Sequence, residues 1–153
     1  MSLFNAADVV QFAIRMEENG EAFYREAERK AAKADAKQLF KRLADEEVAH
    51  QKTFKKMLSQ IGEPAAGETH EGEYLDHLRS YIDSKPIFKG DPSKGGNEMR
   101  AALDAAIQRE LDSVLYYQEL REHVSDEDGK ILDDIIDEER NHFAELSQTR
   151  KRI

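Results

Sequence analysis

The chain has 153 residues, enough to bury a sizeable core, and we expect residues 1–153 to form a single domain. Its formal net charge of −9 disfavours nucleic acid and an anionic membrane surface as partners. The absence of cysteine excludes disulfides, iron–sulfur clusters and thiolate-ligated metal sites. Because we see neither a secretory leader nor a run of roughly 18 apolar residues, we expect no membrane partner and a cytoplasmic location.

Two long helices are expected in the first half of the chain. Asn5 is a plausible N-cap for a helix that continues to about Lys30, and Glu17 lies on the predicted inner face of that helix. Weak break signals follow, and a second helix is expected from about residue 35 to Ile61. Gly62 then ends it.

The second helix carries a carboxylate and an imidazole where core residues are expected. Steps of three and four residues define one stripe: Phe40, Leu43, Glu47, His50, Phe54, Met57 and Ile61. Five of these seven side chains are apolar, so the stripe is predicted to face a core. An unpaired charge there would cost roughly several kcal/mol, and a metal ion is the candidate that would compensate Glu47 and His50.

Residues 62–96 hold all three prolines and six of the eight glycines, which indicates a connection. Within it, residues 74–82 are predicted to form a short helix. A connection of this length allows the next long helix to start at the opposite end of a bundle, as one long crossover does.

Two further long helices are expected after the connection. Asn97 can cap the third helix, whose predicted inner face carries Glu110. Ser125 can cap the fourth helix, which continues to about Thr149. The fourth helix has its own apolar stripe with a polar interruption: Leu132, Ile135, Glu139, His142 and Leu146.

The two halves of the chain look like an internal repeat. Residues 13–17 return as residues 106–110, and the Glu-x-x-His motif returns as well, with offsets of 93 and 92 residues. Glu17 and Glu110 each precede a tyrosine by seven residues, namely Tyr24 and Tyr117. In each predicted hairpin the glutamate of the first helix and the motif of the second are about equally far from the joint. All these polar groups should therefore lie at one level of a four-helix bundle.

Four glutamates and two histidines at one level are typical of a dinuclear metal site. The predicted ligands are Glu17, Glu47, His50, Glu110, Glu139 and His142. Oxygen and imidazole ligands suit two iron ions, with manganese or a mixed pair as the alternative. A set of buried salt bridges without metal is disfavoured, because no lysine or arginine lies on the same stripes.

With these motifs in this order, the chain resembles the rubrerythrin-like branch of the ferritin-like superfamily over nearly its whole length. The resemblance implies an all-α, ferritin-like four-helix bundle with a di-iron centre that reacts with hydrogen peroxide or dioxygen. It also implies that Glu47 and Glu139 bridge the two metals. The implied terminal ligands are Glu17, Glu110, His50 and His142. We expect Tyr24 and Tyr117 to support catalysis by hydrogen bonds to ligand carboxylates.

The chain departs from this family in two respects. Rubrerythrins proper carry a cysteine-rich rubredoxin domain that supplies electrons, so this chain would need an external donor such as a rubredoxin-like protein. They also have an extra glutamate three residues after the third-helix ligand, where this chain has Ser113, with Gly20 at the matching place in the first half. Whether Glu21 is an additional ligand stays open.

The expected function is that of a non-haem di-iron oxidoreductase, foremost a peroxidase, in a homodimer. One alternative is a ferroxidase that oxidises ferrous iron for storage, and another is a metal-stabilised interaction module without turnover. The remaining histidines and three acidic residues beside the predicted ligands are expected on the surface: His70, His77, His123, Glu18, Glu46 and Glu138.

Overall fold

Four long helices make up the described part of the protein, which confirms the expected all-α four-helix bundle. The computed structural model describes residues 6–61 and 96–153, and of residues 96–98 the backbone alone. The helices are α1 (Ala6–Lys30), α2 (Ala34–Ile61), α4 (Gly96–Arg121) and α5 (Asp126–Lys151). The predicted Asn5 cap, the short helix over 74–82 and the two histidines at positions 70 and 77 lie outside the described residues.

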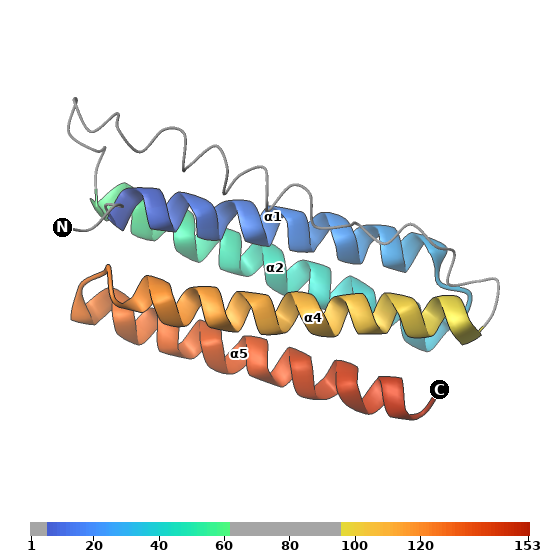
Figure 1. Ribbon diagram of the computed structural model, residues 1–153. Coiled ribbons are helices and arrows are strands. Elements are labelled where there is room, and N and C mark those ends of the chain that lie inside the picture. The colour runs from blue at the N-terminus through green and yellow to red at the C-terminus, as the bar shows by residue number, and fades with distance from the viewer. Residues whose placement is uncertain (1–5, 62–95) are drawn as a thin grey trace, which may run out of the picture.

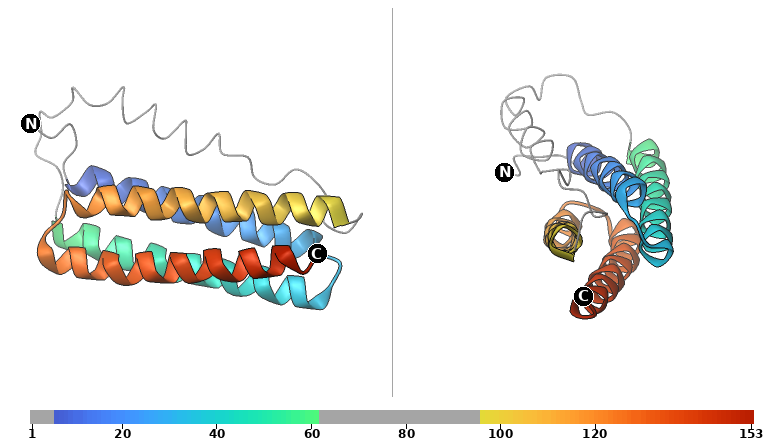
Figure 2. Two further views of the ribbon diagram at one scale, coloured as in Figure 1. Left: turned by 60° about the horizontal axis from the view of Figure 1, so that its bottom comes forward. Right: turned by 90° about the vertical axis from the view of Figure 1, so that its right-hand side faces the viewer.

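The helices form two antiparallel hairpins, α1–α2 and α4–α5, that pack against each other (Figures 1 and 2). The joint of the first hairpin and the joint of the second lie at opposite ends of the bundle (Figure 1). This arrangement requires α4 to begin at the end of the bundle opposite to where α2 finishes, as the predicted crossover would have it. Among the described helices, none combines the length and the apolar character needed to cross a bilayer.

The helix ends follow the local signals of the sequence closely. The joint after α1 is short, and the Ala31 amide still donates to the Ala27 carbonyl at 3.0 Å before α2 starts. At the start of α5 the Ser125 hydroxyl accepts from the Asp128 amide at 3.2 Å, which is the predicted N-cap. The prediction of Asn97 as the cap of α4 is wrong, because that helix already begins at Gly96.

Apolar side chains form two separate core clusters at different levels of the bundle. The first cluster lies toward the α1–α2 joint, and its largest buried members are Phe23, Tyr24, Phe40, Leu43, Leu103 and Leu146. The second lies toward the α4–α5 joint, and its largest buried members are Phe54, Met57, Tyr117, Leu120 and Leu132. Between these clusters all four helices present polar side chains inward, so the bundle has a polar middle enclosed by two apolar regions.

Candidate metal centre

All six predicted ligands are buried at the level between the two core clusters. None of them is more than 5% exposed, although all are charged or titratable: Glu17, Glu47, His50, Glu110, Glu139 and His142. They come from all four helices, and the heptad-like spacing of each stripe turns them toward the bundle axis. The expected convergence of these six side chains at one level is therefore present in the structure.

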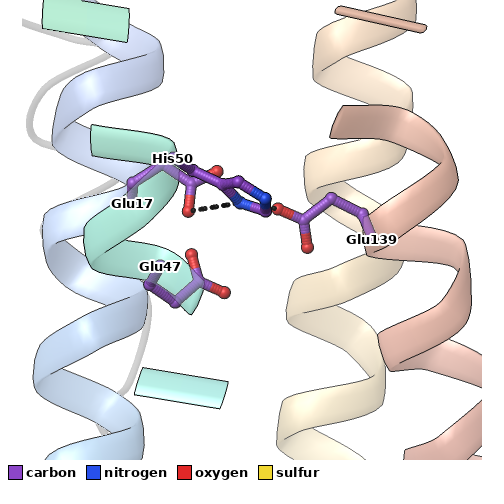
Figure 3. A group of neighbouring side chains, drawn as sticks. All are labelled: Glu17, Glu47, His50 and Glu139. Carbon is purple, nitrogen blue, oxygen red and sulfur yellow. Dashed lines mark ion pairs between the residues drawn. The ribbon is translucent and has the colours of Figure 1, made fainter. Parts of the chain in front are cut away.

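The side chains divide into two groups that share two carboxylates. The first group is Glu17, Glu47, His50 and Glu139. The second group is Glu47, Glu110, Glu139 and His142. Within each group one ligand atom of every residue lies within 4.8 Å of the others. Figure 3 shows the first group, in which the His50 ring lies between the carboxylates of Glu17 and Glu139. Two overlapping groups of this kind suit two cations bridged by the shared carboxylates.

Two tyrosines hold the outer oxygens of the glutamates from α1 and α4. The Tyr24 hydroxyl donates to Oε1 of Glu110 at 2.5 Å, and the Tyr117 hydroxyl donates to Oε1 of Glu17. Each bond crosses from one hairpin to the other, while each tyrosine ring belongs to one of the apolar clusters. The expected hydrogen bonds to carboxylates are thus present, and each leaves Oε2 of its glutamate directed into the site.

The imidazoles direct Nδ1 toward the centre of the site. Nδ1 of His50 lies 3.1 Å from Oε1 of Glu139 and 3.5 Å from Oε2 of Glu17. Nδ1 of His142 lies 3.3 Å from Oε2 of Glu139 and 3.6 Å from Oε2 of Glu110. The ion pairs that the structure describes for these three acidic residues are with the imidazoles and not with lysine or arginine.

Most of the inward-facing atoms have no hydrogen-bond partner among the described residues. These buried atoms are Oε2 of Glu17, Oε2 of Glu110, both carboxylate oxygens of Glu139 and Nδ1 of His50 and His142. Leaving so many buried polar atoms unpaired would cost roughly 1–3 kcal/mol each. These carboxylate oxygens and imidazole nitrogens face one another and not a hydrogen-bond donor of the protein. Such a set of oxygen and nitrogen ligands fits a pair of divalent cations. The residues present therefore suit the metal pair that the sequence predicts.

Without metal, these residues retain protons that they would ordinarily lose. Burial raises the pKa of Glu110 to about 8, with the nearby Glu139 carboxylate adding to the effect. Burial lowers the pKa of His50, but the adjacent Glu139 and Glu17 carboxylates outweigh it and raise that pKa to about 12. For His142 burial is likewise outweighed, here by Glu110 and Glu139, and the pKa rises to about 10. In the metal-free protein these protons thus compensate part of the negative charge that bound cations would neutralise.

The tyrosine hydroxyls stay protonated at this site. Burial raises the pKa of Tyr24 well above its ordinary value, and the charge of Glu110 raises it further. Burial and the charge of Glu17 do the same for Tyr117. In the metal-free protein both phenols are therefore protonated, and can donate hydrogen bonds, at neutral pH.

Gly20 provides the space that the Glu47 carboxylate occupies. A Cβ atom added at Gly20 would lie 2.9 Å from Oε2 of Glu47 and 3.4 Å from a guanidinium nitrogen of Arg109. That guanidinium also lies over the Phe23 ring, with Cζ 5.4 Å from the ring centroid. The absence of a side chain at position 20 therefore decides where one of the two shared carboxylates is placed.

Three acidic side chains near the site have contacts that the sequence did not predict. Glu138 is exposed, as expected, and Glu46 is partly buried, and each of them also reaches the Nε2 atom of an imidazole on the opposite hairpin. Glu21 is absent from both candidate groups, and its Oε1 accepts a hydrogen bond from Gln51 at 3.0 Å instead. Helical spacing predicts which face of a helix a residue lies on, but not which acidic residue contacts a neighbouring helix. No signal in the sequence therefore indicated the contacts of Glu46, Glu138 and Glu21.

A family model described as Rubrerythrin matches residues 8–149, which is nearly the whole chain. No curated protein and no solved structure shows a significant match.

Proposed function

The chain belongs to the rubrerythrin family of non-haem di-iron proteins, and from that membership we propose that it is an oxidoreductase that reduces hydrogen peroxide. The observation that carries the proposal is the pair of overlapping carboxylate and imidazole groups that share Glu47 and Glu139. In this proposal the two shared carboxylates bridge the metals. The terminal ligands are Glu17, Glu110, His50 and His142.

Two ferrous ions bound at these groups would supply the two electrons that, with two protons, convert hydrogen peroxide to two molecules of water. The protein's own contribution is to hold the ligands in place and to exclude bulk water. Phe54 and Tyr117 pack with ring centroids 5.2 Å apart on one side of the site, and Tyr24 stacks on Phe40 at 6.3 Å on the other. These rings cover the polar layer on both sides along the bundle axis.

Tyr24 and Tyr117 are proposed to support catalysis by fixing the terminal carboxylates. Each hydroxyl holds one oxygen of a glutamate, so the second oxygen stays directed at the metal position while the charge of the metals changes. In the metal-free protein their raised pKa values keep both phenols neutral, which preserves this donor role.

These 153 residues contain no cysteine with which to hold a rubredoxin-type iron, so the proposed reaction needs a source of electrons outside them. We propose an external donor, such as a rubredoxin-like protein, and a homodimer as the working assembly. The cytoplasmic location expected from the sequence stays a prediction. Size-exclusion chromatography with light scattering tests the dimer, and a hollow shell of many subunits would instead favour ferroxidase and storage activity.

Stopped-flow oxidation of the ferrous protein tests the proposed reaction. We expect absorbance from the oxidised centre to develop faster with hydrogen peroxide than with an equal concentration of dioxygen. A faster reaction with dioxygen would overturn the peroxidase assignment and favour the ferroxidase. Metal binding without any redox cycling would leave only an interaction module stabilised by metal.

A further inference from the structure

Two glutamates outside the proposed ligand set contact the imidazoles on the side away from the site. Nε2 of His50 lies 2.5 Å from Oε2 of Glu138, within hydrogen-bond distance. Nε2 of His142 forms an ion pair with Oε2 of Glu46. Each glutamate directly precedes a Glu-x-x-His motif, yet it contacts the histidine of the other motif and not its own. The two contacts therefore cross between α2 and α5 in both directions.

The contact between Glu138 and His50 determines which imidazole nitrogen can bind a metal. A carboxylate only accepts hydrogen bonds, so the nitrogen beside Glu138 must carry a proton. A neutral imidazole has one such proton, which leaves the lone pair on Nδ1 of His50. That Nδ1 is the atom beside Glu139 and Glu17 in the candidate site. The contact of Nε2 with Glu138 thus leaves Nδ1 of His50 unprotonated and directed into the candidate site.

A simpler reading is that these contacts only join α2 to α5. Another ion pair, between Arg42 on α2 and Glu145 on α5, already joins the same two helices without touching an imidazole. The Glu138 side chain is 57% exposed, whereas the His50 ring that it contacts is 3% exposed. A solvent-exposed carboxylate that reaches a buried ring points to a role in orienting that ring. Because Arg42 also lies 3.4 Å from Oε1 of Glu46, removal of Glu145 and not of Arg42 provides the comparison that separates the two readings.

We propose that Glu46 and Glu138 are positioning residues, each of which orients the imidazole of the opposite hairpin so that its Nδ1 faces a metal ion. The proposal rests on the di-metal function proposed above. Loss of such an outer partner typically weakens metal binding by about 10- to 100-fold. Because Glu138 acts on His50 alone, its loss should weaken one metal position and leave the position that contains His142 nearly unchanged.

Titration of the metal-free protein with cobalt(II) alone tests the proposal, with visible absorption to resolve the two binding steps. We expect Glu138→Ala to weaken one step by about 10- to 100-fold and Glu138→Gln to recover part of the loss, because the amide oxygen still accepts from Nε2. Asp137→Ala is the matched control, since it removes a neighbouring exposed carboxylate on the same helix. Glu145→Ala removes an α2–α5 ion pair without an imidazole contact.

Proton NMR of the cobalt-loaded protein supplies a readout that helix packing would not change. The unmodified protein should show two shifted, slowly exchanging imidazole N–H signals, one from the Nε2 atom of each histidine. Glu138→Ala should lose one signal and Glu46→Ala the other, while Asp137→Ala and Glu145→Ala keep both.

The outcomes distinguish the positioning role from the proposed function itself. If the unmodified protein binds no cobalt, the metal centre and the positioning role both fail. If it binds two ions and the Glu46 and Glu138 variants match it in affinity and in N–H signals, the positioning role alone is overturned. An equal loss in Glu145→Ala would also overturn it, because the contacts would then only join the helices.

Discussion

Substitution of Gly20 by alanine should act in opposite directions on the stability of the metal-free protein and on metal binding. Gly20 lies inside α1, where alanine in place of glycine favours the helix by about 1 kcal/mol. For a chain of this size, about 1 kcal/mol corresponds to a rise in melting temperature of about 2–4 °C. Without metal the Glu47 carboxylate is the free end of a flexible side chain, so it can move aside and the helix gain should largely remain.

With metal bound, the same substitution meets a carboxylate that cannot move aside. The new Cβ would lie 2.9 Å from Oε2 of Glu47, roughly 0.5 Å closer than an ordinary contact. Metal–oxygen distances tolerate deviations of only about 0.2 Å. We therefore expect at least a tenfold loss of metal affinity, or about 1.4 kcal/mol, which removes about 3–6 °C of the metal-induced rise in melting temperature.

Circular dichroism melts of the chelated and the cobalt-loaded protein measure both effects. Gly129→Ala is the matched control, because Gly129 is also a buried helical glycine but its added Cβ would meet only Arg121 at 3.4 Å. The control should raise the melting temperature equally with and without metal. A Gly20→Ala protein that keeps the full metal-induced rise would refute the claim that Glu47 is held by bound cations.

Three further predictions concern the rest of the site. Tyr24→Phe leaves Oε1 of Glu110 without a donor and should lower the free energy of unfolding in urea by about 1–3 kcal/mol. Tyr116→Phe removes a hydroxyl that donates to the neutral Val9 carbonyl and should cost less, and equal losses would contradict the assigned contact. The melting temperature of the metal-free protein should fall between about pH 6.5 and 10, because the raised pKa values of His50 and His142, and of Glu110 up to about pH 8, make the folded state bind more protons than the unfolded state. A rise in melting temperature over this range would contradict the raised pKa values of these residues. At a free metal concentration 100 times the dissociation constant, chelation should remove about 2.7 kcal/mol for each bound ion, or about 5–11 °C in melting temperature per ion. No change would count against a structural contribution of the metals.

The helices and the inward-facing ligands could be predicted because both depend on local periodicity. Glu47 and His50 interrupt an apolar stripe, and the stripe alone determines that they face the core. Their common level with Glu17 followed from equal distances to a short joint. Ser125 marked the start of α5 because its capping bond is made within its own turn.

The contacts between the hairpins could not be predicted, because they depend on how two helices cross. Glu46 and Glu138 lie one position away from inward-facing residues, on a part of the helix surface that is exposed unless another helix lies nearby. The spacing of Tyr24 showed that its hydroxyl would approach a carboxylate, but not that the carboxylate would be that of Glu110. Gly20 likewise gave no signal, since its effect depends on the rotamer of a side chain from α2.

The reciprocal tyrosine bonds have a consequence for how the two halves of the chain can change over evolutionary time. Tyr24 supports a glutamate 86 positions away and Tyr117 supports one 100 positions away, so neither tyrosine supports the glutamate of its own repeat. A replacement of Tyr24 should therefore be compensated by a change at Glu110 and not at Glu17. In an alignment of homologues, covariation should therefore connect position 24 with 110 and position 117 with 17, across the repeats and not within them.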